Sequence, residues 1–315
     1  MIRGLRGPAA KDKRRAAAPL SLERLEDRWL MSTVYLEVGS SETYKTVQAA
    51  INAVPTNSSN SYDIQIAAGT YNEADVVAQN QNNITLQGLG SGRSTIIQSD
   101  GNGSPAIWVK GSNFSATNIT FYNAATTAQH DEAVYLDTNA THDDFENCTI
   151  KGQQDTFYCS TGVVFDVHSS DIWGSVDFIW GYGTGYFYSD NLYDSKSGGT
   201  ICAPATPQGQ TYGFVFDKCN IAAAPGYSVP ANSVYLGRPW GLYGQAAFID
   251  CTCSNIINSA GWEAFDTQNP DTSRFDQYGL NISTSGFVSW SHNLTSSQAA
   301  SFSQSDVLDG WTPPL

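Results

Sequence analysis

Three observations predict an all-β fold, a right-handed parallel β-helix. Charged residues make up only 15% of the 315 residues, so the Lys- and Glu-rich runs typical of helices are scarce. No apolar pattern with the helical period of 3.6 residues is sustained along the chain. A short strand-like pattern recurs through the middle of the chain instead, and this favours a stack of short strands.

The recurring pattern begins with an aromatic residue or Val and ends in an apolar residue. Its copies are separated by 31, 22, 20, 29 and 32 residues. Constant short strands with connections of variable length are typical of a solenoid, whose coils stack to share one core. A β-sandwich is the structural alternative, but more hairpin turn signals would be expected in it. The copies end at Ile119, Ile150, Ile172, Leu192, Ile221 and Cys253.

The net charge of −14 is unevenly distributed and excludes several partners. Residues 1–32 hold 8 of the 16 basic residues, so the remainder carries 8 basic and 27 acidic residues, or −19. Such a body should repel nucleic acid and anionic membranes. No stretch approaches the roughly 20 apolar residues of a membrane span. We therefore expect neither nucleic acid nor a membrane as a partner.

The basic segment of residues 1–32 predicts a leader that is disordered or removed. It lacks the apolar core of about 7–15 residues found in an ordinary secretory signal. Its end, "LERLEDRWLMS", resembles an N-terminal tag on exported proteins of one group of environmental bacteria. The sequence thus predicts a secreted protein with one β-helix domain over residues 33–315.

Six cysteines and four histidines show no metal-ligand spacing and no CxxC pair. Buried or stacked thiols are the favoured interpretation, and one or two disulfides remain the alternative. We therefore expect neither a metal nor an organic cofactor. The residues are Cys148, Cys159, Cys202, Cys219, Cys251, Cys253, His130, His142, His168 and His292.

Two aspartates hold equivalent places in neighbouring copies of the pattern. Asp155 follows Ile150 by five residues, and Asp177 follows Ile172 by five residues. If the two isoleucines stack, the aspartates lie on adjacent coils, about 4.8 Å apart along the stack. Two carboxylates that close do not readily both ionise, so one is expected to hold a proton. A pair of turn aspartates on a solvated face is the alternative.

Three blocks, "GQQDTFY", "GSVDFIWG" and "YLGRPW", resemble the signature blocks of pectin methylesterases (pectinesterases). Members of that family are right-handed parallel β-helices that remove methyl esters from the galacturonic acid chain of pectin. "YKTVQAAINAVP" is similar to the family's opening helix. "VSWSHNLTSSQAASFSQSDVLDGWTPP" is similar to its C-terminal segment, which contains a short helix. The resemblance covers about residues 36–314 and implies an esterase that releases methanol.

The resemblance also implies roles for single residues. Asp177 takes the place of the nucleophile and Asp155 that of the general acid/base. Gln154 occupies the position of an amide that donates to the developing oxyanion. Arg238 lies where the family holds its nucleophile ionised, and Trp240 where an aromatic ring contributes to the sugar-binding cleft.

Glu132 departs from the family pattern, which usually has Gln as a second oxyanion donor there. We hypothesise that Glu132 is neutral when substrate is bound and donates from its protonated carboxyl group. Trp180 replaces the usual Phe and still supplies a flat apolar wall. Aromatic residues around the blocks are expected to line the substrate groove, with about half of them in the core. They are Tyr158, Phe178, Trp180, Tyr182, Trp240 and Tyr243.

The expected enzyme is a monomer that acts on methylated homogalacturonan. Two other classes stay open from the residues alone. One is another β-helical polysaccharide-active enzyme, a lyase or a glycosidase. The other is a non-catalytic carbohydrate-binding solenoid, which the presence of both aspartates disfavours.

Overall fold

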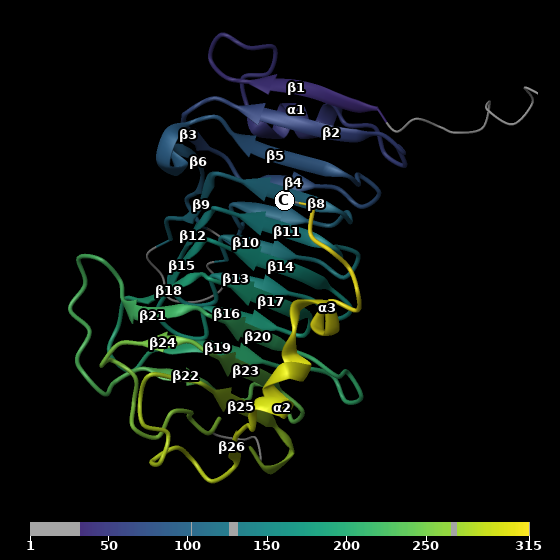
Figure 1. Ribbon diagram of the computed structural model, residues 1–315. Coiled ribbons are helices and arrows are strands. Elements are labelled where there is room, and N and C mark those ends of the chain that lie inside the picture. Colours follow the sequence, from purple (N-terminus) through teal and green to yellow (C-terminus); the bar gives the residue numbers. More distant parts are fainter. Residues whose placement is uncertain (1–31, 102, 126–131, 266–269, 315) are drawn as a thin grey trace, which may run out of the picture. The chain divides into compact units, whose positions relative to one another are not determined.

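The computed structural model describes residues 32–101, 103–125, 132–265 and 270–314. The predicted leader, apart from its last residue, lies outside these ranges, as does His130. Within them every strand pairing is parallel, and the chain winds as a right-handed parallel β-helix (Figure 1). The predicted fold class is therefore confirmed, and the sandwich alternative is excluded.

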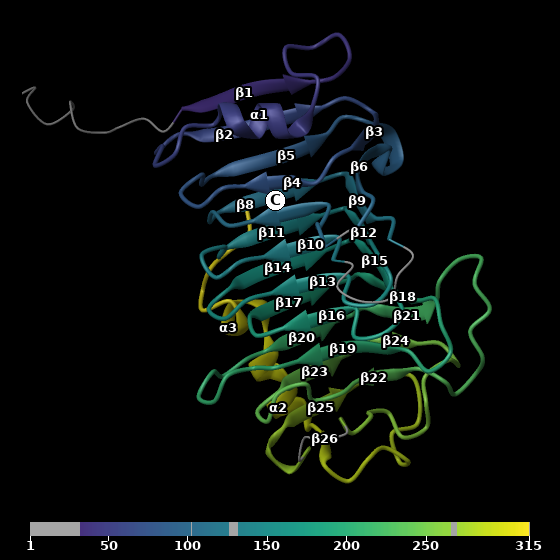
Figure 2. The same ribbon diagram turned by 180° about the vertical axis from the view of Figure 1, so that it is seen from behind.

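Three parallel sheets form the faces of the helix, and each full coil adds one strand to each (Figures 1 and 2). Sheet A contains β1 (Thr33–Val38), β2 (Ser61–Ile66), β5 (Ile84–Gly88), β8 (Phe114–Thr117), β11 (Asp143–Glu146), β14 (Val164–His168), β17 (Thr184–Tyr188), β20 (Phe214–Asp217), β23 (Gln245–Ile249), β25 (Arg274–Tyr278) and β26 (Ser291–Asn293). Sheet B contains β3 (Gly69–Asn72), β6 (Thr95–Ser99), β9 (Ile119–Asn123), β12 (Thr149–Lys151), β15 (Asp171–Gly174), β18 (Asn191–Asp194), β21 (Asn220–Ala223) and β24 (Thr252–Cys253). Sheet C contains β4 (Asp75–Val77), β7 (Ile107–Val109), β10 (Val134–Leu136), β13 (Phe157–Cys159), β16 (Ile179–Gly181), β19 (Thr200–Pro204) and β22 (Tyr235–Gly237).

The helices are short and lie where the resemblance implies them. α1 (Val47–Ala53) begins at the N-cap Thr46, whose side chain accepts a hydrogen bond from a backbone N–H of the first turn. α2 (Ser296–Ala299) and α3 (Gln304–Val307) belong to the C-terminal segment, which runs along the outside of sheet A (Figure 1). No helix in the described ranges is long and apolar enough to cross a bilayer. The remaining helical turns of the described residues are η2 (Ser91–Arg93), η3 (Pro270–Thr272) and η4 (Ala300–Phe302).

The repeat forms a column of stacked apolar side chains inside sheet B. Ile150 pairs with Ile172, and the column continues through the other predicted positions to Cys253. The first copy is shifted, however, because Ile150 pairs with Phe121 and not with Ile119. A slip of two residues keeps the same side chains on the inner face, so the apolar pattern alone does not reveal it.

Six successive turns from sheet A to sheet B, from β8–β9 to β23–β24, each contain one residue with a left-handed backbone, which bends the chain around the corner. Its φ lies between 49° and 58° on six successive coils. Asn, Asp and Gly enter this region most readily, which accounts for part of the Asn-rich composition. The six residues are Asn118, Asn147, Ser169, Ser189, Lys218 and Asp250.

All six cysteines are buried free thiols, which confirms the favoured interpretation. Burial raises the pKa of Cys148 and Cys159 to about 12, so neither thiol reacts as a thiolate near neutral pH. These cysteines behave as small apolar side chains of the shared core.

A buried carboxyl group, Asp194 at the end of β18, should make stability depend on pH. Burial raises its pKa to about 7, whereas an unfolded Asp titrates near pH 4. The folded state therefore holds more protons between about pH 4 and 7, and stability falls as the pH rises through that window. We expect Asp194→Asn to unfold at higher denaturant than wild type at pH 8, by roughly 1–3 kcal/mol, with no gain at pH 4. Asp309→Asn, at an exposed turn, should show no such difference.

Candidate active site

The two predicted aspartates lie side by side at the turn from sheet B to sheet C. Phe157 of β13 pairs with Ile179 of β16, and each aspartate precedes its strand by the same two residues. Asp155 and Asp177 therefore occupy equivalent positions on adjacent coils. Both have left-handed backbones, with φ of 61° and 49°, and the N–H of Asp155 donates to the carbonyl oxygen of Val176. The same turn thus presents both carboxylates on the same side of the stack.

Asp177 forms a two-pronged ion pair with Arg238, which follows β22. Arg238 Nη2 donates to Asp177 Oδ2 over 2.7 Å, and Nε donates to Oδ1 over 2.9 Å. Burial would lower the pKa of Arg238, but the carboxylates of Asp177 and Glu263 raise it above its ordinary value. Such bidentate, charge-assisted bonds fix orientation as well as charge. Asp177 is thereby held as an oriented carboxylate with only 8% of its surface exposed.

Three further residues that the sequence analysis missed complete this arrangement. Thr200 Oγ1 donates to Asp177 Oδ1 over 2.7 Å and accepts from the Asp177 N–H over 3.1 Å. Glu263 accepts a hydrogen bond from Arg238 Nη1 over 3.2 Å, and the ring of Phe265 lies 4.9 Å from the guanidinium carbon. Thr200 occupies the equivalent of Asp177 on the next coil, so only the strand register would have identified it.

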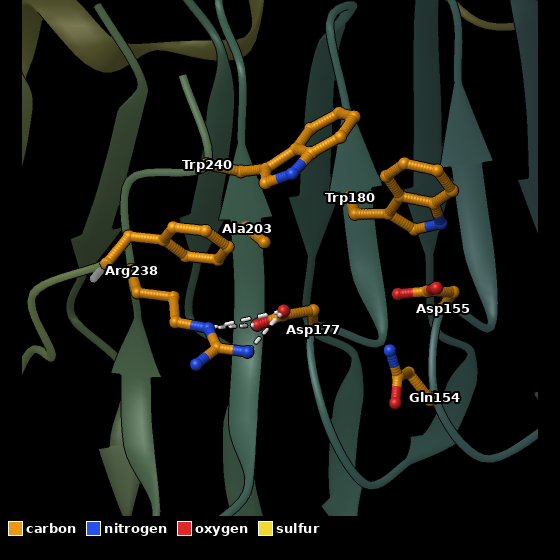
Figure 3. A pocket seen from close by; sticks show the side chains of 8 residues that line it. Gln154, Asp155, Asp177, Trp180, Ala203, Arg238 and Trp240 are labelled. Atoms are coloured by element: carbon orange, nitrogen blue, oxygen red, sulfur yellow. Dashed lines mark hydrogen bonds and ion pairs between the residues drawn. The ribbon is translucent and has the colours of Figure 1, made fainter. Parts of the chain in front are cut away.

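The aspartates open into one cavity of about 280 Å³ (Figure 3). In the close-up Gln154 lies beside Asp155, and the indole rings of Trp180 and Trp240 stand above the two carboxylates. The cavity thus combines an oriented carboxylate, a second acid, an amide and two flat apolar walls. Its lining residues are Gln154, Asp155, Asp177, Trp180, Ala203, Arg238, Trp240 and Phe265.

Glu132 continues the line of acids on the preceding coil. β10 pairs with β13 so that Glu132 is the equivalent of Asp155. Its side chain is buried, with 6% exposed, and it is not among the cavity-lining residues. Acidic side chains therefore occupy this corner on three successive coils, followed by Thr200 on the fourth.

Two of the predicted substrate-binding aromatics lie elsewhere. Phe178 is fully buried in the core, so its prediction as a wall of the groove is wrong. It points inward against the backbone of Gly174, where an added Cβ would come within 2.0 Å of the Phe178 Cβ. Tyr158 is packed between the rings of Tyr135 and Trp180, at centroid distances of 4.4 and 4.5 Å. Its ring therefore contacts Trp180, which lines the cavity.

One group of possible metal ligands occurs in the described ranges, away from this cavity. Asp144, Asp166 and His168 lie on the outer face of sheet A. His168 Nδ1 is 2.8 Å from an Asp166 oxygen, and Gln304 of the C-terminal segment donates to the other oxygen over 2.8 Å. These contacts attach the C-terminal segment to the sheet, so the cluster has a structural explanation.

The fold and the site together define a class, a parallel β-helix that carries two carboxyl groups and an arginine in one cavity. Comparison with known proteins then identifies one family within this class. The sequence model of the pectinesterase family, described as "Pectinesterase", matches residues 34–311. The chain therefore belongs to the pectinesterase family, a group of carboxylic ester hydrolases.

Individual relatives agree with this assignment. A pectinesterase from Daucus carota is 33% identical over 82% of this chain and 86% of its own length. A putative pectinesterase/pectinesterase inhibitor from Arabidopsis thaliana is 31% identical, and the chain spans only about half (52%) of it. The crystal structure of a pectin methylesterase in complex with a hexasaccharide superimposes with a TM-score of 0.76 at 29% identity, covering 89% of this chain and 98% of that one.

Proposed function

We propose that this enzyme removes methyl esters from the C6 carboxyls of methylated homogalacturonan and releases methanol. The observation that carries the proposal is the Arg238-bound carboxylate of Asp177 with Asp155 at the equivalent place one coil away, in one cavity. Relatives named pectinesterases and the hexasaccharide complex of a structural neighbour support pectin as the substrate class.

Asp177 is the nucleophile in this mechanism. Its carboxylate oxygen attacks the ester carbonyl carbon, and the carbonyl electrons move onto the oxygen of a tetrahedral intermediate. Gln154, at the cavity edge, donates to that oxyanion; losing one such donor typically costs about 3 kcal/mol. Arg238 and Thr200 hold the attacking carboxylate in place, so little reorientation is needed during the reaction.

Asp155 moves the protons. In its protonated form it gives a proton to the departing methoxide as the C–O bond breaks, which leaves an anhydride between substrate and Asp177. The resulting carboxylate then takes a proton from water, which attacks the anhydride and regenerates Asp177. The products are methanol and a free galacturonate carboxyl. Water is the only reactant consumed besides the ester.

Product analysis separates this reaction from the other polysaccharide chemistries of the fold. Incubation with highly esterified pectin should release methanol without shortening the chain and without creating unsaturated sugars. Chain cleavage to new reducing ends would identify a glycosidase, and absorbance from unsaturated products would identify a lyase. Binding to pectin without any of these products would identify a carbohydrate-binding solenoid.

Replacing Glu132 by Gln should preserve activity and change its pH dependence. If Glu132 acts as a neutral donor, Gln supplies an uncharged donor of similar shape at every pH. We expect kcat at acidic pH to stay within about threefold of wild type. At higher pH, where wild-type Glu132 would lose its proton, the variant should be the faster enzyme. Measurement of kcat from pH 5 to 9 tests this, and loss of activity at all pH values would contradict the role.

The proposed place of action is outside the cell, and the proposed assembly is a monomer. Pectin is a long polymer that does not cross a membrane, so an enzyme that acts on intact chains has to meet it extracellularly.

A further inference from the structure

The proposed reaction creates a negative charge inside the catalytic cavity. Its substrate is an uncharged methyl ester, and its product at the same place is a carboxylate. Among the described residues that line this cavity, Arg238 alone is basic. An arginine that faces a carboxylate binds it through charge-assisted hydrogen bonds. A free guanidinium here would therefore hold the product more tightly than the substrate, and turnover would slow as product accumulates.

Each nitrogen of the Arg238 guanidinium, however, already donates to a carboxylate of the protein. Nε and Nη2 donate to Asp177 over 2.9 and 2.7 Å (Figure 3). Nη1, the remaining nitrogen, donates to Glu263 Oε2 over 3.2 Å. The cation thus has two carboxylate partners, and the three side chains together carry one net negative charge.

The fold fixes the position of Glu263. Its backbone N–H donates over 3.0 Å to the carbonyl oxygen of Gly237, the residue directly before Arg238. The neighbouring Trp262 is buried in the core, and its indole N–H donates to Gln277 over 2.9 Å. These contacts hold the segment that carries Glu263 against the segment that carries Arg238. The Glu263 side chain therefore reaches Nη1 while 36% of it stays exposed.

We propose that Glu263 is a specificity-determining residue that keeps Arg238 from binding the carboxylate formed in the reaction. Glu263 accepts from Nη1 and adds a negative charge beside the guanidinium, so Arg238 orients Asp177 and the anionic product is released. This inference rests on the proposed esterase function, since that reaction produces the carboxylate. The alternative role is positional, in which Glu263 only holds Arg238 in place for Asp177.

The Glu263→Gln variant separates the two roles, because Gln keeps an acceptor for Nη1 and loses the charge. Calorimetry measures Kd for fully de-esterified trigalacturonate, and initial rates measure KM for the fully methyl-esterified trimer. We expect Kd to fall about fivefold in the variant, the upper range for one partly exposed charge, with less than about a twofold change in KM. The gain in affinity should shrink with added salt, because salt screens exposed charges.

Two further variants serve as controls. The Glu146 side chain is 39% exposed, close to the value for Glu263, and lies on the outer face of sheet A beside His168. Glu146→Gln removes the same charge there and should leave Kd for trigalacturonate at the wild-type value. Glu263→Ala removes both the charge and the acceptor, so it should combine the tighter product binding with a lower kcat. A wild-type Kd in Glu263→Gln, with the loss of kcat confined to Glu263→Ala, would establish the positional role and overturn the inference.

The binding measurement also keeps this inference separate from the proposed function, because it requires no turnover. If wild type releases methanol and Kd is unchanged in Glu263→Gln, the role of Glu263 is refuted and the esterase function stands. The same conclusion follows if wild type releases methanol and neither protein binds trigalacturonate at millimolar concentration. Tighter binding in Glu263→Gln without methanol release by wild type would support the charge role of Glu263 and refute the esterase function.

Discussion

Replacing Asp177 by Asn is expected to lower kcat for methanol release from esterified pectin by about 10⁴-fold or more. Asn has the shape of Asp and can still accept a hydrogen bond from Arg238, but its neutral amide does not attack an ester. The remaining rate would come from binding and from the oxyanion donor alone. Single-turnover methanol release measures the loss directly and separates it from changes in substrate affinity.

A matched control is available in Asp250, which also has a left-handed backbone, with φ of 49°. It is exposed at a sheet A–B corner, away from the cavity-lining residues, so Asp250→Asn should keep full activity. Both variants should unfold at the same denaturant concentration as wild type. An Asp177→Asn protein that retained more than about 1% of wild-type turnover would refute a covalent role for this carboxylate.

Replacing Asp155 by Asn is expected to slow methanol release by roughly 10²- to 10⁴-fold, the usual contribution of general acid–base catalysis. The loss should depend on the leaving group. Methoxide is a poor leaving group that needs a proton, whereas a nitrophenolate departs without one. With a nitrophenyl ester of galacturonic acid, the Asp155→Asn variant should therefore form the anhydride and release nitrophenol at nearly the wild-type rate.

Hydrolysis of the anhydride would remain slow in this variant, because the substituted Asn side chain does not take a proton from the attacking water. We expect a rapid burst of about one equivalent of nitrophenol per enzyme, followed by slow turnover. Stopped-flow absorbance resolves the two phases. Equal slowing on both esters, with no burst, would show that Asp155 acts by positioning the substrate and not by transferring protons.

The sequence was sufficient to predict the stack of coils and the position of the two aspartates within it. Ile150 and Ile172 are paired as their spacing required, so Asp155 and Asp177 fall at equivalent positions. The predicted register of the first copy is wrong by two residues, because Ile150 pairs with Phe121 and not with Ile119. A shift of two residues leaves the same side chains facing the core, so the apolar pattern does not distinguish the two registers. Turn length, and not apolar pattern, sets that register.

The sequence did not predict several contacts between residues that are far apart along the chain. Phe178 was assigned to the groove because it lies beside Asp177 in sequence, yet successive residues around a bend can point to opposite sides. Glu263 reaches Arg238 from a loop beyond β24, and no local motif marks it.

The site gathers one side chain from each of several consecutive coils, in the order in which the chain is synthesised. Glu132, Asp155, Asp177 and Thr200 belong to four neighbouring rungs, and the guanidinium that completes the arrangement arrives 61 residues after the aspartate it binds. A nascent or partly translocated polypeptide that ends before Arg238 thus possesses the carboxylates without their counter-ion. On the proposed mechanism such a chain would lack the cation that orients Asp177, so activity would require the coil that carries Arg238 to have formed.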